Sequence, residues 1–108
     1  MFEVNLLHTK YSESNMTAFL NELDEIIHKR KTAPKEGSYT STLFESGTDR
    51  ILKKIGEEAG EVIIAAKNRD ASELCNESAD LLFHLMVALR DQDLSINDVV
   101  AVLQQRHQ

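Results

Sequence analysis

Two short stretches of the sequence carry carboxylates at helical spacing. Residues 54–61 read Lys-Ile-Gly-Glu-Glu-Ala-Gly-Glu, and residues 77–80 read Glu-Ser-Ala-Asp. Because an α-helix turns about 100° per residue, acidic residues three positions apart lie on one face. The residues that complete this Glu-x-x-Glu and Glu-x-x-Asp pattern are Glu58, Glu61, Glu77 and Asp80. Clustered carboxylate oxygens are typical ligands of a hard divalent cation.

The second stretch lies in a segment that is too apolar for a solvated surface. Glu77, Asp80 and His84 fall within about 60° of one another on a helix, whereas residues 79–89 are otherwise mostly apolar. Burying ionised carboxylates is costly unless cations compensate their charge, and facing carboxylates repel each other. A divalent metal removes both problems, and oxygen-only ligands suit magnesium, with manganese as the alternative. We therefore predict an acidic Mg²⁺ site between two helices.

Length and composition restrict the classes of protein. A chain of 108 residues with 42% hydrophobic and 28% charged residues fits one globular domain with a single core. The net charge of −6 argues against nucleic acid or an acidic membrane as the main partner. Because the sequence lacks a membrane-length apolar run and a secretion signal, we expect a cytoplasmic protein. The single cysteine, Cys75, is predicted to be a small buried hydrophobic residue.

Hydrophobic periodicity predicts an all-α chain that begins with an arm. Residues 1–15 show no sustained period and are taken as an amino-terminal arm. A first helix is predicted over residues 16–31, where apolar residues recur at helical spacing. Pro34 and Gly37 interrupt the pattern, and the hydroxyl-rich run from Ser38 to Thr42 has the composition of a loop.

A long helix should carry the first acidic stretch. Ser46 or Thr48 would cap its amino terminus, and it should end near residues 68–70. The side of this helix opposite the carboxylates is predicted to face the core. Its apolar residues are Ile51, Leu52, Ile55, Ala59, Val62, Ile63 and Ala66.

Two more helices follow from capping signals. Asp70 and Glu73 have the spacing of a capping pair for a third helix that reaches about Asp91. Ser95 and Asp98 have the same spacing and open a fourth helix.

Together these elements make residues 16–108 a single all-α domain of four to five helices. Short connections make the second and third helices antiparallel neighbours in a bundle. Glu61 lies about two turns before their connection and Glu77 about two turns after it. The acidic residues of the two helices should therefore face each other at one height.

Each of these features also has a simpler interpretation. Glu57 and Glu58 could lie on a solvated face, where Arg50 and Lys54 would pair with them as surface ions. His84 alone could be a core histidine with satisfied hydrogen bonds. Other site chemistries fit less well, because the sequence lacks paired Glu-x-x-His motifs, zinc-type Cys and His spacing and a P-loop.

Five segments, in this order and at this spacing, carry a family resemblance. They are Gly37-Ser-Tyr-Thr40, Leu43-Phe44, residues 49–58, residues 61–68 and residues 77–84. Together they resemble the phosphoribosyl-ATP pyrophosphatases, which catalyse the second step of histidine biosynthesis. The carboxylate pattern alone marks only the wider all-α nucleoside-triphosphate pyrophosphatase superfamily, whereas the Gly-Ser-Tyr-Thr and Lys-x-Gly-Glu-Glu contexts favour this member. The resemblance covers residues 16–108, without the cyclohydrolase domain found in bifunctional versions, and so implies a stand-alone enzyme.

The resemblance implies a reaction, a cofactor and an assembly. Members hydrolyse the α–β phosphoanhydride of phosphoribosyl-ATP to phosphoribosyl-AMP and pyrophosphate and require magnesium. They form homodimers in which helices of both subunits build the site. A second subunit would complete the bundle and explain a third helix that is apolar almost all round.

The resemblance also suggests roles for individual residues. The expected metal ligands are Glu58, Glu61, Glu77 and Asp80. Glu57 is the candidate for orienting or deprotonating the attacking water, a role that Glu58 could exchange with it. The basic residues expected at phosphate oxygens are Lys54, Arg50 and Lys67. The residues expected to donate to the phosphoribosyl group are Ser38, Tyr39 and Thr40, and His84 would orient an acidic ligand.

Two rival functions remain open at this point. The same carboxylates could serve a housekeeping pyrophosphatase that acts on ordinary or damaged nucleoside triphosphates. From a different class, the chain could be a non-catalytic helical dimerisation module, or a histidine phosphotransfer bundle that uses His84. The Leu-Met-Val sequence after His84 does not match the His-x-x-Lys-Gly context usual in phosphotransfer proteins.

Overall fold

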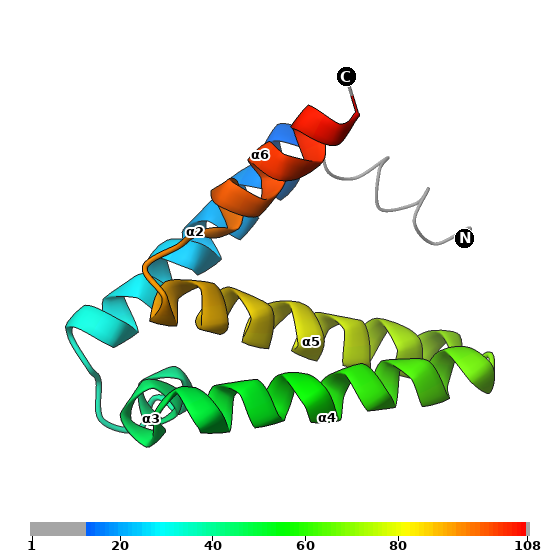
Figure 1. The fold of residues 1–108 in the computed structure, drawn as a ribbon, viewed down its shortest axis with the longest axis horizontal. Helices are drawn as coiled ribbons and strands as arrows, with labels where there is room; N and C mark the ends of the chain where they lie inside the picture. The colour runs from blue at the N-terminus through cyan, green and yellow to red at the C-terminus, as the bar shows by residue number, and fades with distance from the viewer. Residues whose placement is uncertain (1–12, 108) are drawn as a thin grey trace.

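The computed structural model describes residues 13–107, and this part of the chain is all α-helical (Figure 1). Its helices are α2 (Glu13–Thr32), α3 (Tyr39–Ser46), α4 (Thr48–Lys67), α5 (Ala71–Asp91) and α6 (Ile96–Arg106). The all-α prediction is confirmed, and α2 starts three residues earlier than expected. The rest of the predicted arm, residues 1–12, lies outside the described residues.

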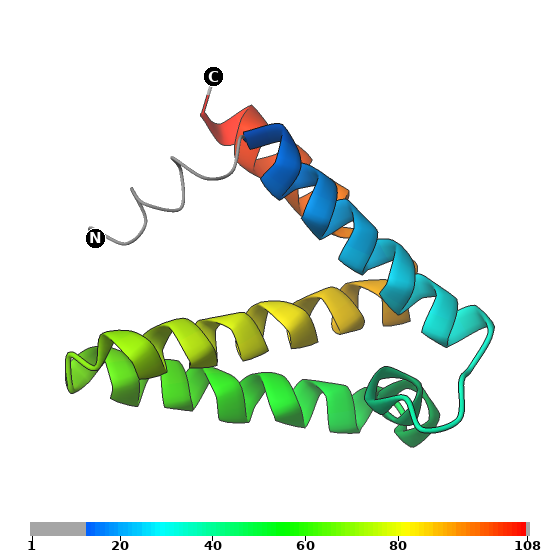
Figure 2. The same cartoon turned by 180° about the vertical axis from the view of Figure 1, so that it is seen from behind.

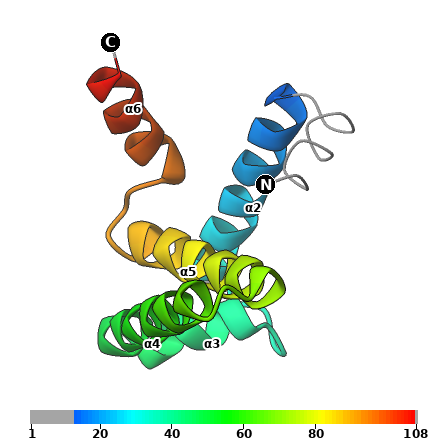
Figure 3. The same cartoon turned by 90° about the vertical axis from the view of Figure 1, so that its right-hand side faces the viewer.

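The helices form a hairpin and two projecting arms. α4 and α5 run antiparallel along their whole length, as predicted, with the short α3 at the start of α4 (Figures 1 and 2). α2 and α6 leave the hairpin at the carboxyl end of α5. Viewed along the hairpin, these two helices diverge from each other above it (Figure 3). A large part of the surface of the hairpin is therefore not covered by α2 or α6.

The core lies where α2, α3, α4 and α5 meet. The fully buried side chains are Ile27, Leu43, Ile51, Met86 and Val87. Burying a side chain of this size stabilises the folded chain by about 1.5–3 kcal/mol relative to exposure. The core therefore fixes the amino-terminal half of α4 against the carboxyl-terminal half of α5, and the hairpin extends beyond it.

Two of the predicted helix starts are confirmed by their hydrogen bonds. The Asp70 carboxylate accepts from the backbone N–H of Glu73 at 3.0 Å and caps α5. Ser95 and Asp98 form a reciprocal capping box at the start of α6. These bonds satisfy backbone donors that have no partner within the helix.

The predicted cap of α4 is wrong. The N-cap is Gly47, and no side chain caps this helix. Gly47 has φ 98°, a left-handed conformation that glycine adopts without the steric cost of a Cβ, and this lets α3 run directly into α4. Both predicted caps are engaged elsewhere, because Ser46 donates to the Thr42 carbonyl and Thr48 donates to the Asp91 carboxylate.

The prediction of a loop from Ser38 to Thr42 is also wrong. Ser38 is the N-cap of α3, and its hydroxyl oxygen accepts from the backbone N–H of Ser41 at 3.1 Å. Thr42 donates its hydroxyl to the Ser38 carbonyl. The hydroxyl groups that suggested a loop therefore serve helix capping and local backbone bonds, while Leu43 anchors the helix in the core.

The predicted core face of α4 is only partly buried. Ile51 is fully buried, but Leu52 and Ile63 are 49% and 68% exposed, and Ala66 is exposed as well. Glu58 is buried instead, with 6% of its surface exposed. The helix is therefore rotated so that the Glu58 carboxylate lies between α4 and α5, whereas Leu52 and Ile63 are exposed.

Cys75 is exposed, so the prediction of a buried hydrophobic residue is wrong. It lies in the amino-terminal half of α5, which runs alongside α4 in the hairpin (Figure 1). None of the helices in residues 13–107 combines the length and the hydropathy needed to span a membrane.

Candidate metal centre

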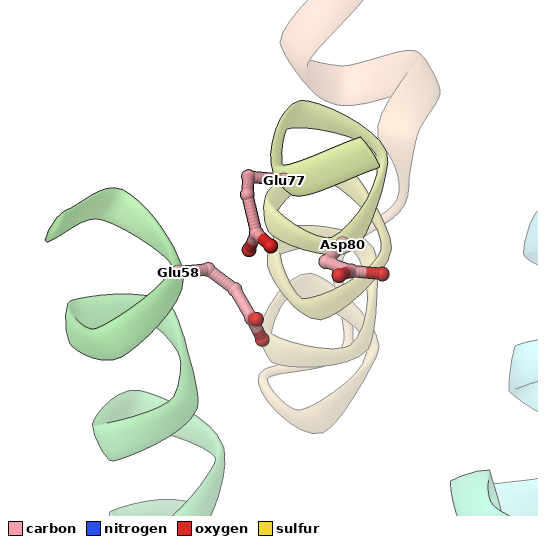
Figure 4. Close-up of side chains that lie close together, drawn as sticks. All are labelled: Glu58, Glu77 and Asp80. Atoms are coloured by element: carbon pink, nitrogen blue, oxygen red, sulfur yellow. The ribbon is translucent and has the colours of Figure 1, made fainter. Parts of the chain in front are cut away.

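Three carboxylates from the two hairpin helices meet at one point. Glu58 reaches from α4 toward α5, where Glu77 and Asp80 lie one turn apart (Figure 4). One oxygen from each residue lies within 4.8 Å of the others. The antiparallel hairpin brings these residues together, and three of the four predicted metal ligands are members of this cluster.

Two oxygens of the cluster are buried and have no hydrogen-bond partner among residues 13–107. They are Glu58 Oε1 and Glu77 Oε2. His84 Nδ1 lies 2.8 Å from Glu58 Oε1, but the hydrogen bond of this nitrogen is made to the Asp80 carbonyl, also at 2.8 Å. A buried carboxylate oxygen without a donor carries an unbalanced desolvation cost. A cation between the carboxylates would satisfy both oxygens.

The crowding of negative charge raises the pKa of Glu77. A side-chain hydrogen bond with Glu61 is the largest cause that raises this pKa, from 4.5 to about 7, followed by burial and by the charges of Glu61, Asp80 and Glu73. The raised pKa reflects the electrostatic cost of bringing these carboxylates together, which a bound cation would relieve.

This donor set fits a divalent cation. All of the ligand atoms are carboxylate oxygens, two of them lack any other partner, and they come from rigid helices on both sides of a seam. Hard cations such as Mg²⁺ and Mn²⁺ prefer such ligands. Glu58, Glu77 and Asp80 would hold the ion, and the Glu61 carboxyl group lies beside Glu77.

Glu61 and Glu77 line the same groove, as expected for residues at one height on facing helices. Glu61 itself is exposed and is not one of the three clustered carboxylates. Glu57 is exposed as well, and its carboxylate lies 3.8 Å from Lys54 Nζ. Glu57 and Lys54 therefore form a surface ion pair of the kind considered from the sequence.

The other predicted phosphate contacts are not gathered at the cluster. Arg50 and Lys67 are both exposed on α4. Within residues 13–107, no ion pair joins either of them to the clustered carboxylates. The structure therefore leaves both side chains available to a ligand without placing them around one.

The three residues predicted to bind the phosphoribosyl group, Ser38, Tyr39 and Thr40, face two different parts of the structure. Tyr39 Oη lies 2.9 Å from Nε2 of His84, whose Nδ1 in turn lies 2.8 Å from Glu58 Oε1 of the cluster. Ser38 and Thr40 line a separate groove of about 360 Å³ beside the carboxyl end of α2. Arg30 and Lys35 also line this groove, and they were not predicted as site residues because neither belongs to a carboxylate or hydroxyl motif.

A second groove adjoins the cluster and adds residues that sequence reasoning missed. It has a volume of about 380 Å³. Its lining residues are Glu61, Ile64, Ala65, Asn68, Asp70, Glu73 and Glu77. Glu73 was considered only as a capping residue, although its position four residues before Glu77 places both on one face of α5. That spacing was the available signal.

Comparison with known proteins decides the family. Residues 20–107 match the family model described as phosphoribosyl-ATP pyrophosphohydrolase. The chain belongs to this family. The phosphoribosyl-ATP pyrophosphohydrolase family is the one that the Gly-Ser-Tyr-Thr and Glu-x-x-Glu motifs resemble, so the recognition from the sequence is confirmed.

Individual relatives agree with the family assignment. The phosphoribosyl-ATP pyrophosphatase of Streptococcus gordonii is 62% identical over 72% of this chain and 75% of its own length. That of Leptospira biflexa is 53% identical over 82% of this chain and 97% of its own. The histidine biosynthesis bifunctional protein HisIE of Bacillus subtilis is 52% identical over 92% of this chain and 47% of its own. The chain thus spans about half the length of the bifunctional relatives that it matches.

Proposed function

We propose that this protein hydrolyses phosphoribosyl-ATP to phosphoribosyl-AMP and pyrophosphate, the second step of histidine biosynthesis, in the cytoplasm. The observation that carries the proposal is the cluster of Glu58, Glu77 and Asp80, with two unpartnered buried oxygens, in a chain of the phosphoribosyl-ATP pyrophosphohydrolase family. The substrate carries a triphosphate, and a chain of net charge −6 needs a cation to accept it.

Glu58, Glu61, Glu77 and Asp80 would hold magnesium in this proposal, with manganese as the alternative. When bound, the ion neutralises negative charge on the triphosphate oxygens and helps to position a water molecule. The buried ring of His84, whose Nδ1 lies 2.8 Å from Glu58 Oε1, restricts the position of that ligand by lying beside it. Because Glu58 and Glu77 come from facing helices, the hairpin holds the ligands in place before the substrate arrives.

In the proposed hydrolytic step, a glutamate side chain accepts the proton of the attacking water. The oxygen of water bonds to the α-phosphorus, the bond from this phosphorus to the bridging oxygen breaks, and the bond electrons leave with pyrophosphate. Glu57 takes the proton of the water in this scheme, because it is next to Glu58 in sequence and is exposed, whereas the buried Glu58 serves as a ligand. Lys54 lies 3.8 Å from Glu57 and can exchange this ion pair for a phosphate oxygen.

The phosphoribosyl end is assigned to the other side of the site. Ser38 and Thr40 line the groove together with the cations Arg30 and Lys35, and one carboxylate, Glu36, lines it as well. Cationic and hydroxyl donors suit a phosphate. Arg50 and Lys67, which are exposed on α4, remain candidates for contacts with the triphosphate.

A homodimer completes this proposal. An apolar groove of about 390 Å³ lies along α5 and α6. Its lining residues are Leu82, Leu85, Ala88, Leu89, Gln92, Leu94, Ile96 and Val99. Leu82 and Leu85 are 39% and 41% exposed, and no residue of α6 is buried. Exposed apolar surface of this kind marks an interaction face, and a second copy of the chain covers it in the proposed assembly.

The catalytic proposal is tested by pyrophosphate release from phosphoribosyl-ATP. We expect release with Mg²⁺ that stops when a chelator is added and returns when excess Mg²⁺ is restored. A panel of ordinary and damaged deoxynucleoside triphosphates is the comparison, and these should be cleaved at least about a hundredfold more slowly, in kcat/KM, because they lack the phosphoribosyl group.

The rival functions give other results in the same assay. Cleavage of the deoxynucleotide panel with phosphoribosyl-ATP inert would replace the proposed substrate and keep the metal site. No turnover of any substrate and no metal binding would favour a non-catalytic helical module.

The dimer is tested by light scattering, where we expect a mass of twice the 12.2 kDa chain. Leu85→Asp places a carboxylate in the apolar groove. The dissociation constant of the dimer should therefore rise by at least about a hundredfold in this variant. Asn97→Asp is the matched control, because it introduces the same group at an exposed polar position of α6. A wild-type protein that stays monomeric at high concentration would contradict the proposed assembly.

A further inference from the structure

Tyr39 makes a contact that its proposed role at the substrate does not explain. Its hydroxyl oxygen lies 2.9 Å from His84 Nε2, although the two residues are 45 positions apart in sequence. Tyr39 opens α3, whereas His84 is buried in α5 with 5% of its surface exposed. The hydroxyl is thus directed to the seam that contains the carboxylates.

The surroundings of His84 determine which atom donates. Its Nδ1 lies 2.8 Å from the Asp80 carbonyl and 2.8 Å from Glu58 Oε1, and both of these oxygens are acceptors. Nδ1 must therefore carry the ring hydrogen. With a single ring hydrogen on His84, Nε2 is an acceptor, and in this form the Tyr39 hydroxyl donates its hydrogen to Nε2.

Aromatic packing holds this arrangement together. The ring of Tyr39 is stacked on Phe83, with ring centroids 6.3 Å apart, and meets the edge of His84 at 5.9 Å. Phe83 also meets His84 edge-on, at 5.2 Å. Such pairs have defined geometries that favour one arrangement of the three rings. The hydroxyl of Tyr39 adds a polar restraint at Nε2, on the side of the imidazole away from Glu58.

We propose that Tyr39 is a positioning residue, which fixes His84 by donating to Nε2 and thereby holds the Glu58 carboxylate ready to bind the metal ion. This inference rests on the proposed metal site. It changes the role expected for Tyr39, because a hydroxyl hydrogen that is used on His84 cannot also be donated to the phosphoribosyl group. It also links α3, which adjoins the groove of Ser38 and Thr40, to the metal ligands.

The test is Mn²⁺ binding to the full-length protein without nucleotide, measured for wild type and Tyr39→Phe. This variant keeps the ring and removes only the hydroxyl. We expect the Mn²⁺ dissociation constant to rise by about tenfold, as for residues that support metal ligands. The matched control is Ser46→Ala, which removes a hydroxyl at the exposed end of the same helix and should change the constant by less than about twofold.

A double-variant cycle shows whether Tyr39 acts through His84. In a His84→Asn background the added Tyr39→Phe change should weaken Mn²⁺ binding by less than about twofold, because the acceptor is already gone. An equal loss in both backgrounds would overturn the inference. Unchanged Mn²⁺ affinity in Tyr39→Phe, with a raised KM for phosphoribosyl-ATP, would overturn it in favour of a direct substrate contact.

The same measurements separate this inference from the proposed function. Mn²⁺ binding needs no substrate, so a wild-type protein that binds Mn²⁺ as expected but leaves phosphoribosyl-ATP intact would refute the reaction alone. A wild-type protein that hydrolyses phosphoribosyl-ATP, with an unaffected Mn²⁺ constant in Tyr39→Phe, would refute the positioning role alone.

Discussion

Replacing Glu58 with glutamine is expected to lower kcat/KM for phosphoribosyl-ATP by about a thousandfold, which is the loss seen when one preorganised electrostatic group is removed from an active site. Glu58 is the one carboxylate of the cluster that is buried, and it is the link between α4 and the two acidic residues of α5. Glutamine has nearly the same volume but lacks the charge that a cation needs.

The Glu58→Gln protein should remain folded, because the substitution leaves no cavity and removes a buried negative charge that has no aligned donor. Circular dichroism would check this before the assay. Its Mn²⁺ dissociation constant should rise together with the loss of turnover. Glu61→Gln should also lose activity, although less, because Glu61 is exposed and lies beside the cluster.

Glu45→Gln is the matched control for these two variants. Glu45 is an exposed carboxylate on α3 and belongs to neither groove. Its removal should leave kcat/KM within about twofold of wild type, as for most surface substitutions. If Glu58→Gln retained more than about a tenth of the wild-type activity, the carboxylate cluster would not be the metal site of catalysis.

Much of this site could be predicted from the sequence, because helical periodicity is local. Glu-x-x-Glu and Glu-x-x-Asp each define one face of one helix, and the short connection between α4 and α5 leaves an antiparallel hairpin as the simple solution. Equal distances from that connection then place Glu61 beside Glu77. None of these steps required knowledge of how the rest of the chain packs.

The predictions of burial that were wrong concern residues whose environment depends on tertiary packing. Periodicity alone placed Ile63 and Leu52 toward the core, yet both are exposed, because α5 lies against the stripe that contains Ile51 and Glu58. Nothing local in the sequence distinguishes an apolar face that meets α5 from one that remains open in a single chain. Cys75 was placed wrongly for the same reason.

The prediction of a loop for the hydroxyl-rich segment from Ser38 to Thr42 was wrong for a different reason. Serine and threonine favour both loops and helix N-caps, so composition could not separate these outcomes. The helix is favoured here because Leu43 is buried in the core, and this burial stabilises α3 although it has only eight residues. The contact between Tyr39 and His84 follows from that helix and could not be inferred before α3 was placed.

The largest effect on stability is expected from breaking the ion pair between Asp24 and Arg90. Arg90 Nε and Nη2 donate to the two carboxylate oxygens of Asp24, at 2.9 and 2.6 Å. The side chain of Asp24 is only 4% exposed and that of Arg90 17%. The hydrogen bond with Asp24 raises the pKa of Arg90 above its already high value, so this side chain stays charged.

Arg90→Ala should therefore lower the free energy of unfolding by about 3–5 kcal/mol, because it leaves the Asp24 carboxylate buried without its cation. Urea unfolding followed by circular dichroism measures this loss. The control is Asp93→Asn, which breaks the pair with Lys31 at a side chain that is 89% exposed. It should lower Tm by less than about 3 °C, because exposed pairs contribute little.

A double variant separates the worth of the pair from the cost of breaking it. Replacing both residues, as in Asp24→Leu with Arg90→Met, removes the buried charges together and should restore most of the stability lost in Arg90→Ala. The pair joins α2 to the carboxyl end of α5, so it ties one projecting arm to the hairpin that carries the carboxylates. If Arg90→Ala were as stable as wild type, the apolar contacts of α2 and the hydrogen bonds of Lys31 to the end of α5 would hold this helix, and the ion pair would contribute orientation without stability.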